Sequence, residues 1–249
     1  MTSALKIIED FTPVSLQEID AVKLMDRVDT KFTFHNNKLS TILSQLKNSY
    51  RILSINDTRI HPYESVYFDT SDFKLYLQHH NGKLNRFKLR YRKYATNNKI
   101  FFEIKKKNNQ GRTSKKRIQV PALDTGINQT CLDFVKKEVD SSRAFEYKLS
   151  NYFSRITFVN NLFTERITID FNLILKNDSS TKSFENIVIA EVKHAKGCKS
   201  DFVKLMRENR IANTSISKYC LGVISLYPNV KYNAFKEKII KLNKIKHAA

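Results

Sequence analysis

The chain has 249 residues, of which 41% are hydrophobic, enough to fill the core of one large domain or two small ones. Its formal net charge of +20 favours anionic substrates and partners. The three cysteines, Cys131, Cys198 and Cys220, lack metal-ligand spacing and indicate reduced thiols in a cytoplasmic setting. No segment has the apolar length of a signal peptide or a membrane span, so we expect a soluble, cytoplasmic protein.

Hydrophobic periodicity predicts a mixture of helices and strands. The expected helices cover residues 16–25, 38–46, 130–139, 143–153, 200–207, 219–226 and 231–246. Ser15 and Glu18 have the spacing of a capping box before the first helix, and Ser200 can cap the fifth. The expected strands cover residues 27–34, 64–69, 84–94, 99–107, 114–120, 155–159, 164–174 and 186–194. No linker or repeat divides the chain, so we expect one domain over residues 1–249, ending in a basic helix within residues 228–249.

Charged and apolar residues alternate along several of these strands. In residues 86–92, cations occupy one face and apolar side chains the other, because successive side chains of a strand point to opposite faces. The same alternation recurs in residues 27–32, 102–107, 165–171 and 189–193, where carboxylates join the cations. One basic strand face is usually just solvated, but five together favour a sheet whose polar side surrounds an anion.

Two arrangements keep these charges out of a dry core, where an unpaired charge costs several kcal/mol. The charged faces could form the outside of an ordinary sheet, or they could line the wet lumen of a barrel. The consistently apolar opposite faces favour the barrel. We therefore expect an α+β fold with a closed antiparallel β-barrel of about eight strands and helices packed outside it. An elongated anion such as triphosphate or polyphosphate suits such a lumen better than nucleic acid, and we expect no specific nucleic-acid partner.

An ordered set of motifs gives the barrel a family resemblance. The motifs are residues 27–32 (RVDTKF), 65–70 (SVYFDT), 88–94 (KLRYRKY), 103–105 (EIK), 115–117 (KKR), Arg155, 166–170 (RITID), 191–193 (EVK) and 217–220 (SKYC). Together they resemble the VTC domain, the catalytic module of the eukaryotic vacuolar transporter chaperone complex, which also occurs as a stand-alone bacterial protein. That domain belongs to the triphosphate tunnel metalloenzyme (CYTH-like) group, and the resemblance spans about residues 25–227. It implies a β-barrel tunnel that binds ATP with a divalent metal, Mn²⁺ or Mg²⁺, and makes inorganic polyphosphate.

The resemblance also implies roles for individual residues. The phosphate-binding, catalytic positions match Lys31, Arg90, Arg92, Lys105, Lys115, Arg155, Arg166 and Lys218. Glu191 matches the metal-binding glutamate, and Glu103 is either a second metal ligand or a carboxylate that holds a neighbouring cation. We assign substrate binding to Lys88, Arg117 and Lys193. The chain departs from the wider pattern at Arg27 and Asp29, where two glutamates are common, and at Phe153, where a tyrosine is common.

The predicted function is transfer of the γ-phosphate of ATP to a growing polyphosphate chain, with release of ADP. A metal-dependent triphosphatase and a non-catalytic polyphosphate binder are the alternatives. The basic C-terminal helix either packs against the domain or contacts a membrane or a membrane-protein partner. We expect Asp69 and Thr70 to stabilise a turn, and His61, His79 and His80 to lie on the surface.

Overall fold

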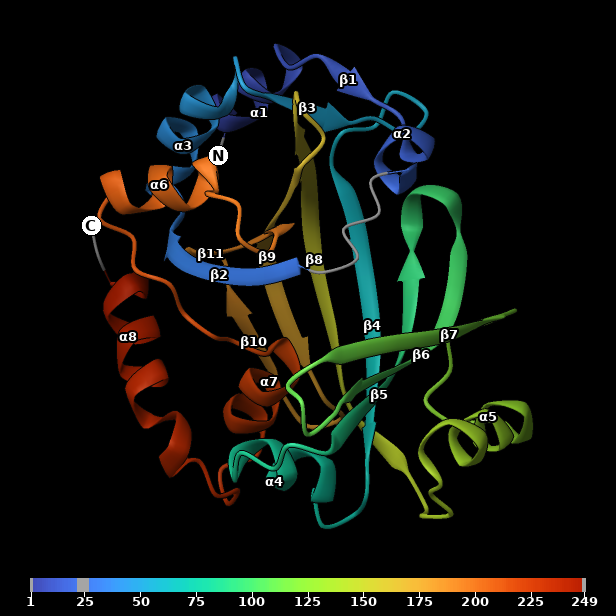
Figure 1. Cartoon of the computed structure of the whole chain (residues 1–249). Coiled ribbons are helices and arrows are strands. Elements are labelled where there is room, and N and C mark those ends of the chain that lie inside the picture. The colour runs from blue at the N-terminus through green and yellow to red at the C-terminus, as the bar shows by residue number, and fades with distance from the viewer. Residues whose placement is uncertain (1, 22–26, 248–249) are drawn as a thin grey trace.

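The computed structural model describes residues 2–21 and 27–247, and one large antiparallel sheet dominates it (Figure 1). Eight strands follow one another in the order β2–β11–β9–β8–β4–β5–β6–β7. Their bounds in that order are Arg27–His35, Ile187–Ala195, Glu165–Lys176, Glu146–Asn160, His61–Asp69, Arg86–Tyr94, Lys99–Lys107 and Thr113–Val120. Three short strands extend the sheet, β1 (Pro13–Val14), β3 (Tyr50–Leu53) and β10 (Thr181–Phe184). The predicted α+β class with a dominant antiparallel sheet is confirmed.

The sheet curls but hydrogen bonds do not close it. In the described residues β2 and β7, the two ends of the strand order, do not pair with each other. The outer edge of β2 is instead occupied by the segment after α6, where the amide of Thr214 donates to the carbonyl of Lys31 (2.7 Å) and Asn213 bridges to Phe32. Hydrogen bonds therefore do not close the described part of the sheet, and the expected closed barrel is not confirmed.

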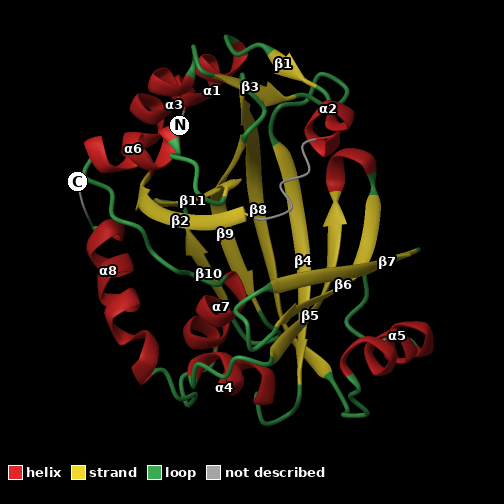
Figure 2. Ribbon diagram, viewed as in Figure 1, coloured by secondary structure: helices red, strands yellow, loops and turns green. Residues whose placement is uncertain are grey.

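Helices cover both the outer and the inner side of this curled sheet (Figure 2). Their bounds are α1 Thr2–Glu9, α2 Leu16–Ala21, α3 Leu39–Leu46, α4 Lys74–His80, α5 Gln129–Val139, α6 Asp201–Glu208, α7 Lys218–Leu226 and α8 Lys236–Lys246. Helices α1, α3 and α6 pack on the apolar face of β2, β11, β9 and β8, and α5 packs on that of β5 and β6. In the described part of the chain no helix is long and apolar enough to cross a lipid bilayer.

Helix α7 differs from the expectation that every helix packs outside. An added Cβ at Gly222 would lie 2.7 Å from Cδ2 of Leu149, so this helix approaches β8 very closely. Leu149 pairs with Tyr67 across β8 and β4, and directly opposite residues share a face of the sheet. That face is the polar, inner one, where Tyr67 lies. Packing there brings Lys218, the first residue of α7, to the inside of the curled sheet.

The expected elements are mostly present, with one clear error. Ser15 and Glu18 form the predicted capping box, with Oγ donating to Oε2 over 2.6 Å, and Ser200 accepts from the amide of Val203. The helix expected over 143–153 is wrong, because β8 covers Glu146–Asn160. The first helix was expected to extend to residue 25, and residues 22–25 lie outside the described residues. The sequence analysis also missed α1, α4, β1, β3 and β10.

Asp69 has the structural role that was expected of it. Its Oδ1 accepts from the amides of Thr70 (2.7 Å) and Leu75 (2.8 Å), and its Oδ2 accepts from the amide of Tyr76 (2.8 Å) and the hydroxyl of Tyr219. One buried carboxylate therefore fixes both the start of α4 and the start of α7.

The histidines do not all lie on the surface as expected. His61 and His80 are buried. The ring of His61 contacts Thr96 Oγ1 (3.0 Å), and Nε2 of His80 accepts from the amide of Ala234 (3.2 Å). Both rings therefore fix loops of the fold.

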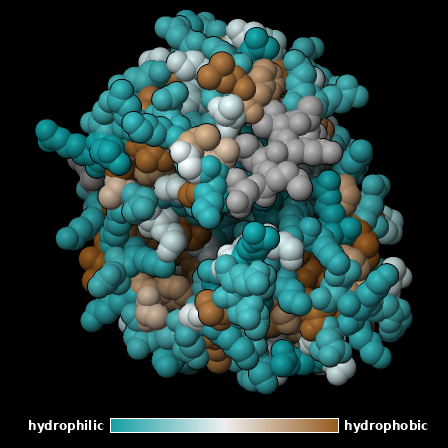
Figure 3. All heavy atoms as spheres, in the orientation of Figure 1, coloured by the Kyte–Doolittle hydropathy of each residue, from teal (hydrophilic) through white to brown (hydrophobic). Residues whose placement is uncertain are grey.

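The C-terminal helix α8 packs an apolar stripe against the domain. Leu242 is buried, and Ile239 and Ile245 contact the same core as α7. Lys241 donates to Thr214 Oγ1 (2.6 Å). The surrounding face of the molecule is mostly hydrophilic (Figure 3).

Candidate active site

All thirteen residues proposed from the sequence line one cavity inside the curled sheet, with a volume of about 1780 Å³. They are Lys31, Lys88, Arg90, Arg92, Glu103, Lys105, Lys115, Arg117, Arg155, Arg166, Glu191, Lys193 and Lys218. Among the described residues, the cavity lining contains seventeen Lys and Arg residues against four Asp and Glu residues. The structure thus brings together residues that lie up to 187 positions apart in the sequence. The role of each individual residue stays a prediction.

Strand register explains how the wall formed by β5, β6 and β7 becomes basic. Directly opposite residues share a face, so each cross-strand row contributes side chains to the same side. Among the rows that face the cavity, Arg90, Glu103 and Arg117 form the first, and Lys88, Lys105 and Lys115 form the second.

Glu103 is the buried centre of the first row, with a side chain only 1% exposed. Arg90 donates to its Oε2 from both Nε (2.8 Å) and Nη2 (2.6 Å), and Nζ of Lys115 lies 2.6 Å from its Oε1. Burial alone would raise the pKa of Glu103, but Arg90, Arg92 and Lys115 hold it well below its usual range. Because both oxygens are bound by cations, the geometry supports the second of its two predicted roles, holding neighbouring cations in place.

Asp170 does the same for a second group of cations, and the sequence analysis did not assign it a role. Its oxygens accept from Nε (2.6 Å) and Nη2 (2.8 Å) of Arg155, and Oδ2 also accepts from Lys218. Burial would raise the pKa of Asp170, but Arg155 and Lys218 lower it to about 2. Strand alternation placed this residue on the polar face, but its partners on β8 and α7 could not be read from spacing.

Glu191 links two lysines on β2 and β11. Its Oε1 accepts from Nζ of Lys31 (2.8 Å) and Nζ of Lys193 (2.7 Å), and Lys193 also donates to Asp29 Oδ2 (2.6 Å). Burial would raise the pKa of Glu191, but Lys193 and Lys31 hold it well below its usual range. The carboxylate is therefore ionised at neutral pH.

Aromatic rings support the remaining cations. Tyr63 and Phe153 stack with ring centroids 5.2 Å apart. Arg155 lies 4.9 Å from the centroid of Tyr63, and Nζ of Lys218 lies 4.2 Å from that of Phe153. A phenylalanine at position 153 therefore keeps the cation–π support even though it lacks a hydroxyl.

Burial, together with neighbouring cations, lowers the pKa of several lysines in the cavity. Burial lowers the pKa of Lys105 to about 8, and Lys31 and Arg90 add to the effect while Glu191 opposes it. Burial likewise lowers the pKa of Lys115 to about 8, with Glu103 opposing. A bound polyanion would favour the charged form of each lysine.

Tyr67 is a further cavity residue that the sequence analysis missed. Its hydroxyl oxygen accepts from Arg90 Nη1 (3.3 Å) and Asn151 Nδ2 (3.5 Å), and neither contact uses the hydroxyl proton. Burial would raise the pKa of Tyr67, but Arg90, Arg92 and Lys218 lower it to about 8. The sequence did contain a signal for the placement of Tyr67. It lies in the predicted strand 64–69, two residues before Asp69, and residues two apart in a strand share a face.

Comparison with known proteins identifies the family. The family model of the VTC domain matches residues 26–227, which is most of the chain. The chain belongs to the VTC domain family. A search of the curated proteins found no match.

Solved structures with similar folds are distant from this VTC domain. One is the Hippeastrum protein HpAC1, described as having a dominant triphosphatase activity, with a TM-score of 0.49 and 13% identity over 81% of this chain and 96% of that one. Another is a Vibrio parahaemolyticus protein proposed to be an adenylate cyclase, with a TM-score of 0.47 and 12% identity over 79% of this chain and 99% of that one. The family assignment rests on the VTC match alone.

The VTC family implies a divalent metal, and Glu191 is the carboxylate that fits it best. In the part of the chain that the structure describes, no three His, Cys, Asp or Glu side chains gather as a metal cluster. Mg²⁺ commonly needs only one or two protein carboxylates, because substrate phosphates and water complete its coordination. Lys31 and Lys193 both donate to Oε1 of Glu191, and neither donates to Oε2. Glu191 thus fits a metal that is bound together with the phosphates.

Proposed function

We propose that this VTC domain is an ATP-dependent polyphosphate polymerase, which transfers the γ-phosphate of ATP to a growing polyphosphate chain and releases ADP. The observation that carries the proposal is the cationic cavity in which Glu103, Asp170 and Glu191 each hold at least two cations. The VTC match supports a phosphate-chain substrate, which such a cavity suits.

Positioning and charge neutralisation supply most of the catalysis of phosphoryl transfer. The guanidinium groups of Arg90 and Arg155 can form planar pairs with phosphate oxygens, whereas Lys31 and Lys105 provide point charges. Carboxylates that hold these cations in place keep the cavity organised before substrate binds. The terminal phosphate of a chain is anionic near neutral pH, so the attack needs no dedicated general base. A divalent metal held by Glu191, Mn²⁺ or Mg²⁺, would neutralise further phosphate charge when bound.

The decisive experiment is an assay of products. Purified protein is incubated with ATP and Mn²⁺, or with ATP and Mg²⁺, with and without a short polyphosphate primer. Long-chain polyphosphate is then resolved from orthophosphate by gel electrophoresis. Polymerase activity yields long chains and ADP in step, whereas release of orthophosphate under every condition would identify a triphosphatase and overturn the proposal.

A variant of Glu191 separates catalysis from anion binding. Glu191→Gln should abolish polymer synthesis, while the affinity for tripolyphosphate is retained or increased, because Lys31 and Lys193 are released from their carboxylate. Glu138→Gln is a matched control, since Glu138 pairs with Lys116 (2.6 Å) and neither residue lines the cavity. Polymer synthesis at the parent rate by Glu191→Gln would remove Glu191 from the proposed metal site.

A further inference from the structure

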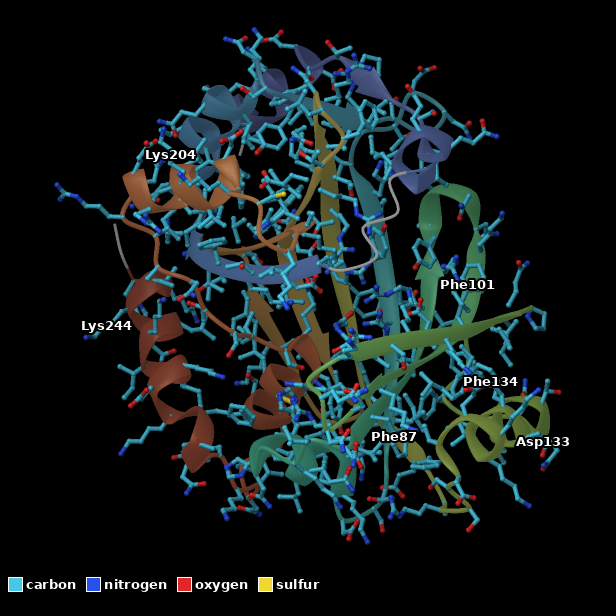
Figure 4. The ribbon with its side chains drawn as sticks, viewed as in Figure 1. Phe87, Phe101, Asp133, Phe134, Lys204 and Lys244 are labelled. Atoms are coloured by element: carbon cyan, nitrogen blue, oxygen red, sulfur yellow. The ribbon has the colours of Figure 1, made fainter. Side chains whose placement is uncertain are left out.

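A thiol, an imidazole and a lysine meet beside the main cavity, where α4 contacts both α7 and the start of β5. Sγ of Cys220 in α7 lies 3.0 Å from Nδ1 of His79 in α4 and 3.9 Å from Nζ of Lys88 in β5. Figure 4 shows Phe87, the neighbour of Lys88, in the lower part of the molecule, where Figure 1 also places α4 and α7. The proposed function uses neither Cys220 nor His79, so this cluster is available for another role.

Cys220 lies beside a second, smaller cavity. The residue is only 3% exposed, but together with His79 and Lys238 it lines a cavity between α7 and α8 with a volume of about 90 Å³. One water molecule needs only roughly 10–15 Å³ of such volume. His79 and Ser217 line both this cavity and the main one. A molecule as small as hydrogen peroxide therefore fits next to the sulphur atom.

The charges around the sulphur favour an anion over a metal cation. Burial lowers the pKa of His79 to about 2, and nearby cations add to the effect, chiefly Lys88 and Arg86. A metal ion would meet the same cations, and in the described part of the chain no third His, Cys, Asp or Glu joins the pair as a ligand. Burial also lowers the pKa of Lys88 and of Arg86, and a charged Cys220 opposes this. Negative charge on the sulphur is thus attracted by both cations.

The place of Cys220 in α7 adds to this environment. It is the third residue of the helix, and its amide donates to Oγ of the N-cap Ser217 (3.3 Å). Cysteines at helix N-termini and beside cations are the ones that react as nucleophiles. The imidazole of His79 is neutral, so its Nδ1 can hold the thiol in place through a hydrogen bond.

We propose that Cys220 is a modification site for peroxides, and that its oxidation to a sulfenic acid weakens anion binding in the main cavity. A sulphur lone pair attacks the peroxide, and an S–O bond forms as the O–O bond breaks. Sulphur is oxidised by two electrons and the peroxide is reduced, while the thiol proton joins the leaving hydroxide to give water. A thiol reductant reverses the modification.

Lys88 links the modified sulphur to phosphate binding. Its Nζ donates to Ser217 Oγ (2.8 Å) and lies in the lining of the main cavity. A thiol sulphur is a weak hydrogen-bond acceptor, whereas the new oxygen on Cys220 is a strong one. The oxygen therefore draws Lys88 away from a bound phosphate, and it adds bulk two residues after Lys218 in the first turn of α7. This inference rests only on the anion-binding part of the proposed function.

The test measures both modification and binding in the parent, in Cys220→Ser and in Cys198→Ser, a matched control that removes an exposed thiol. After treatment with hydrogen peroxide, dimedone labels sulfenic acids and peptide mass spectrometry locates the label. Calorimetry measures tripolyphosphate binding by unlabelled samples before peroxide, after peroxide and after dithiothreitol. Loss of part of one charge-assisted hydrogen bond should weaken binding by roughly 3- to 30-fold in the parent and in Cys198→Ser, and by less than about twofold in Cys220→Ser. Dithiothreitol should restore the affinity.

His79→Leu tests the partner of the thiol. It should slow the labelling of Cys220, while the reduced variant binds tripolyphosphate like the parent. A labelling rate equal to that of the parent would remove His79 from the site.

Three results overturn the inference: peroxide labels Cys198 but not Cys220, the labelled parent keeps its affinity, or Cys220→Ser loses as much affinity as the parent. Any of them in a protein that makes polymer would refute this inference alone. Labelling needs no phosphate ligand. A reduced parent that does not bind tripolyphosphate would therefore refute the proposed function and the link to binding, whereas the label still decides whether Cys220 is a modification site.

Discussion

Removal of Arg90 should reveal how strongly the cavity depends on its buried carboxylates. Arg90→Ala removes both hydrogen bonds to Oε2 of Glu103, a side chain that is 1% exposed. Breaking a buried ion pair by removing one partner costs about 3–5 kcal/mol, because the other charge stays buried. Lys115 remains bound to Oε1, so we expect the free energy of unfolding to fall by about 3 kcal/mol, near the lower end of that range.

A second substitution separates this loss of stability from the loss of binding. Adding Glu103→Gln to Arg90→Ala removes the uncompensated charge and should restore more than half of the lost stability. Glu103→Gln alone should cost less, about 1 kcal/mol, because Arg90 and Lys115 can still reach water in the cavity, with side chains 19% and 39% exposed. Tripolyphosphate affinity should stay low in both proteins that lack Arg90.

Urea unfolding followed by far-UV circular dichroism provides the free energies, because the chain contains no tryptophan for fluorescence. The four proteins form a double-mutant cycle with an expected coupling of about 2 kcal/mol or more. Two results would refute the role of Glu103 in holding neighbouring cations. One is a double variant whose loss of unfolding free energy equals the sum of the two single losses, and the other is an Arg90→Ala protein as stable as the parent.

Three further predictions test other parts of the site. Tripolyphosphate affinity should be highest below about pH 8 and fall as the pH rises to about 9. The reason is that Lys105 and Lys115, each with a pKa of about 8, lose the charge that the anion binds. Calorimetry in two buffers of different ionisation enthalpy should detect proton uptake on binding near pH 8, and its absence would contradict these pKa values. Tyr67→Phe should slow polymer synthesis by about 2- to 10-fold, because it removes one hydroxyl donor worth about 0.5–1.5 kcal/mol to the bound substrate. A parent-like rate would exclude contact between this hydroxyl and the substrate. Gly222→Ala should destabilise the domain by about 1–3 kcal/mol, because its Cβ would meet Leu149 at 2.7 Å, and an unchanged urea midpoint would show that α7 can move away freely.

Much of the cavity lining was predictable because side chains alternate with a period of two along a strand, whereas Arg155 and Lys218 were assigned from the family resemblance. Once residues 86–94 and 99–107 are recognised as strands, the faces of Arg90 and Lys105 are fixed, even if the strand ends are misplaced by a residue or two. The ion pairs within the cavity were not predictable in this way. Asp170 and Lys218 are 48 positions apart, and their contact depends on the inner packing of α7.

The error over residues 143–153 has a local cause. Leu149 and Phe153 are four positions apart, a spacing that equally suits one face of a helix. In the structure they pair with Tyr67 and Tyr63 of β4, and both lie on the inner face of the sheet. Long-range pairing on both sides of β8 overrides the local pattern, and a single sequence contains no direct signal for it.

The open edge between β2 and β7 changes how the cavity is closed. The amide of Thr214 donates to Lys31 at the edge of β2, and no backbone hydrogen bond joins β2 to β7 in the described residues. Lys105 on β6 is close enough to Lys31 and Glu191, on β2 and β11, for their charges to shift its pKa in opposite directions. Cations from the two ends of the sheet thus face each other across the cavity, and their repulsion disfavours a tight closure in the absence of ligand. If a phosphate chain bound between them, as proposed, it would replace that repulsion with attraction on both sides, and would supply contacts that strand pairing supplies in a closed barrel.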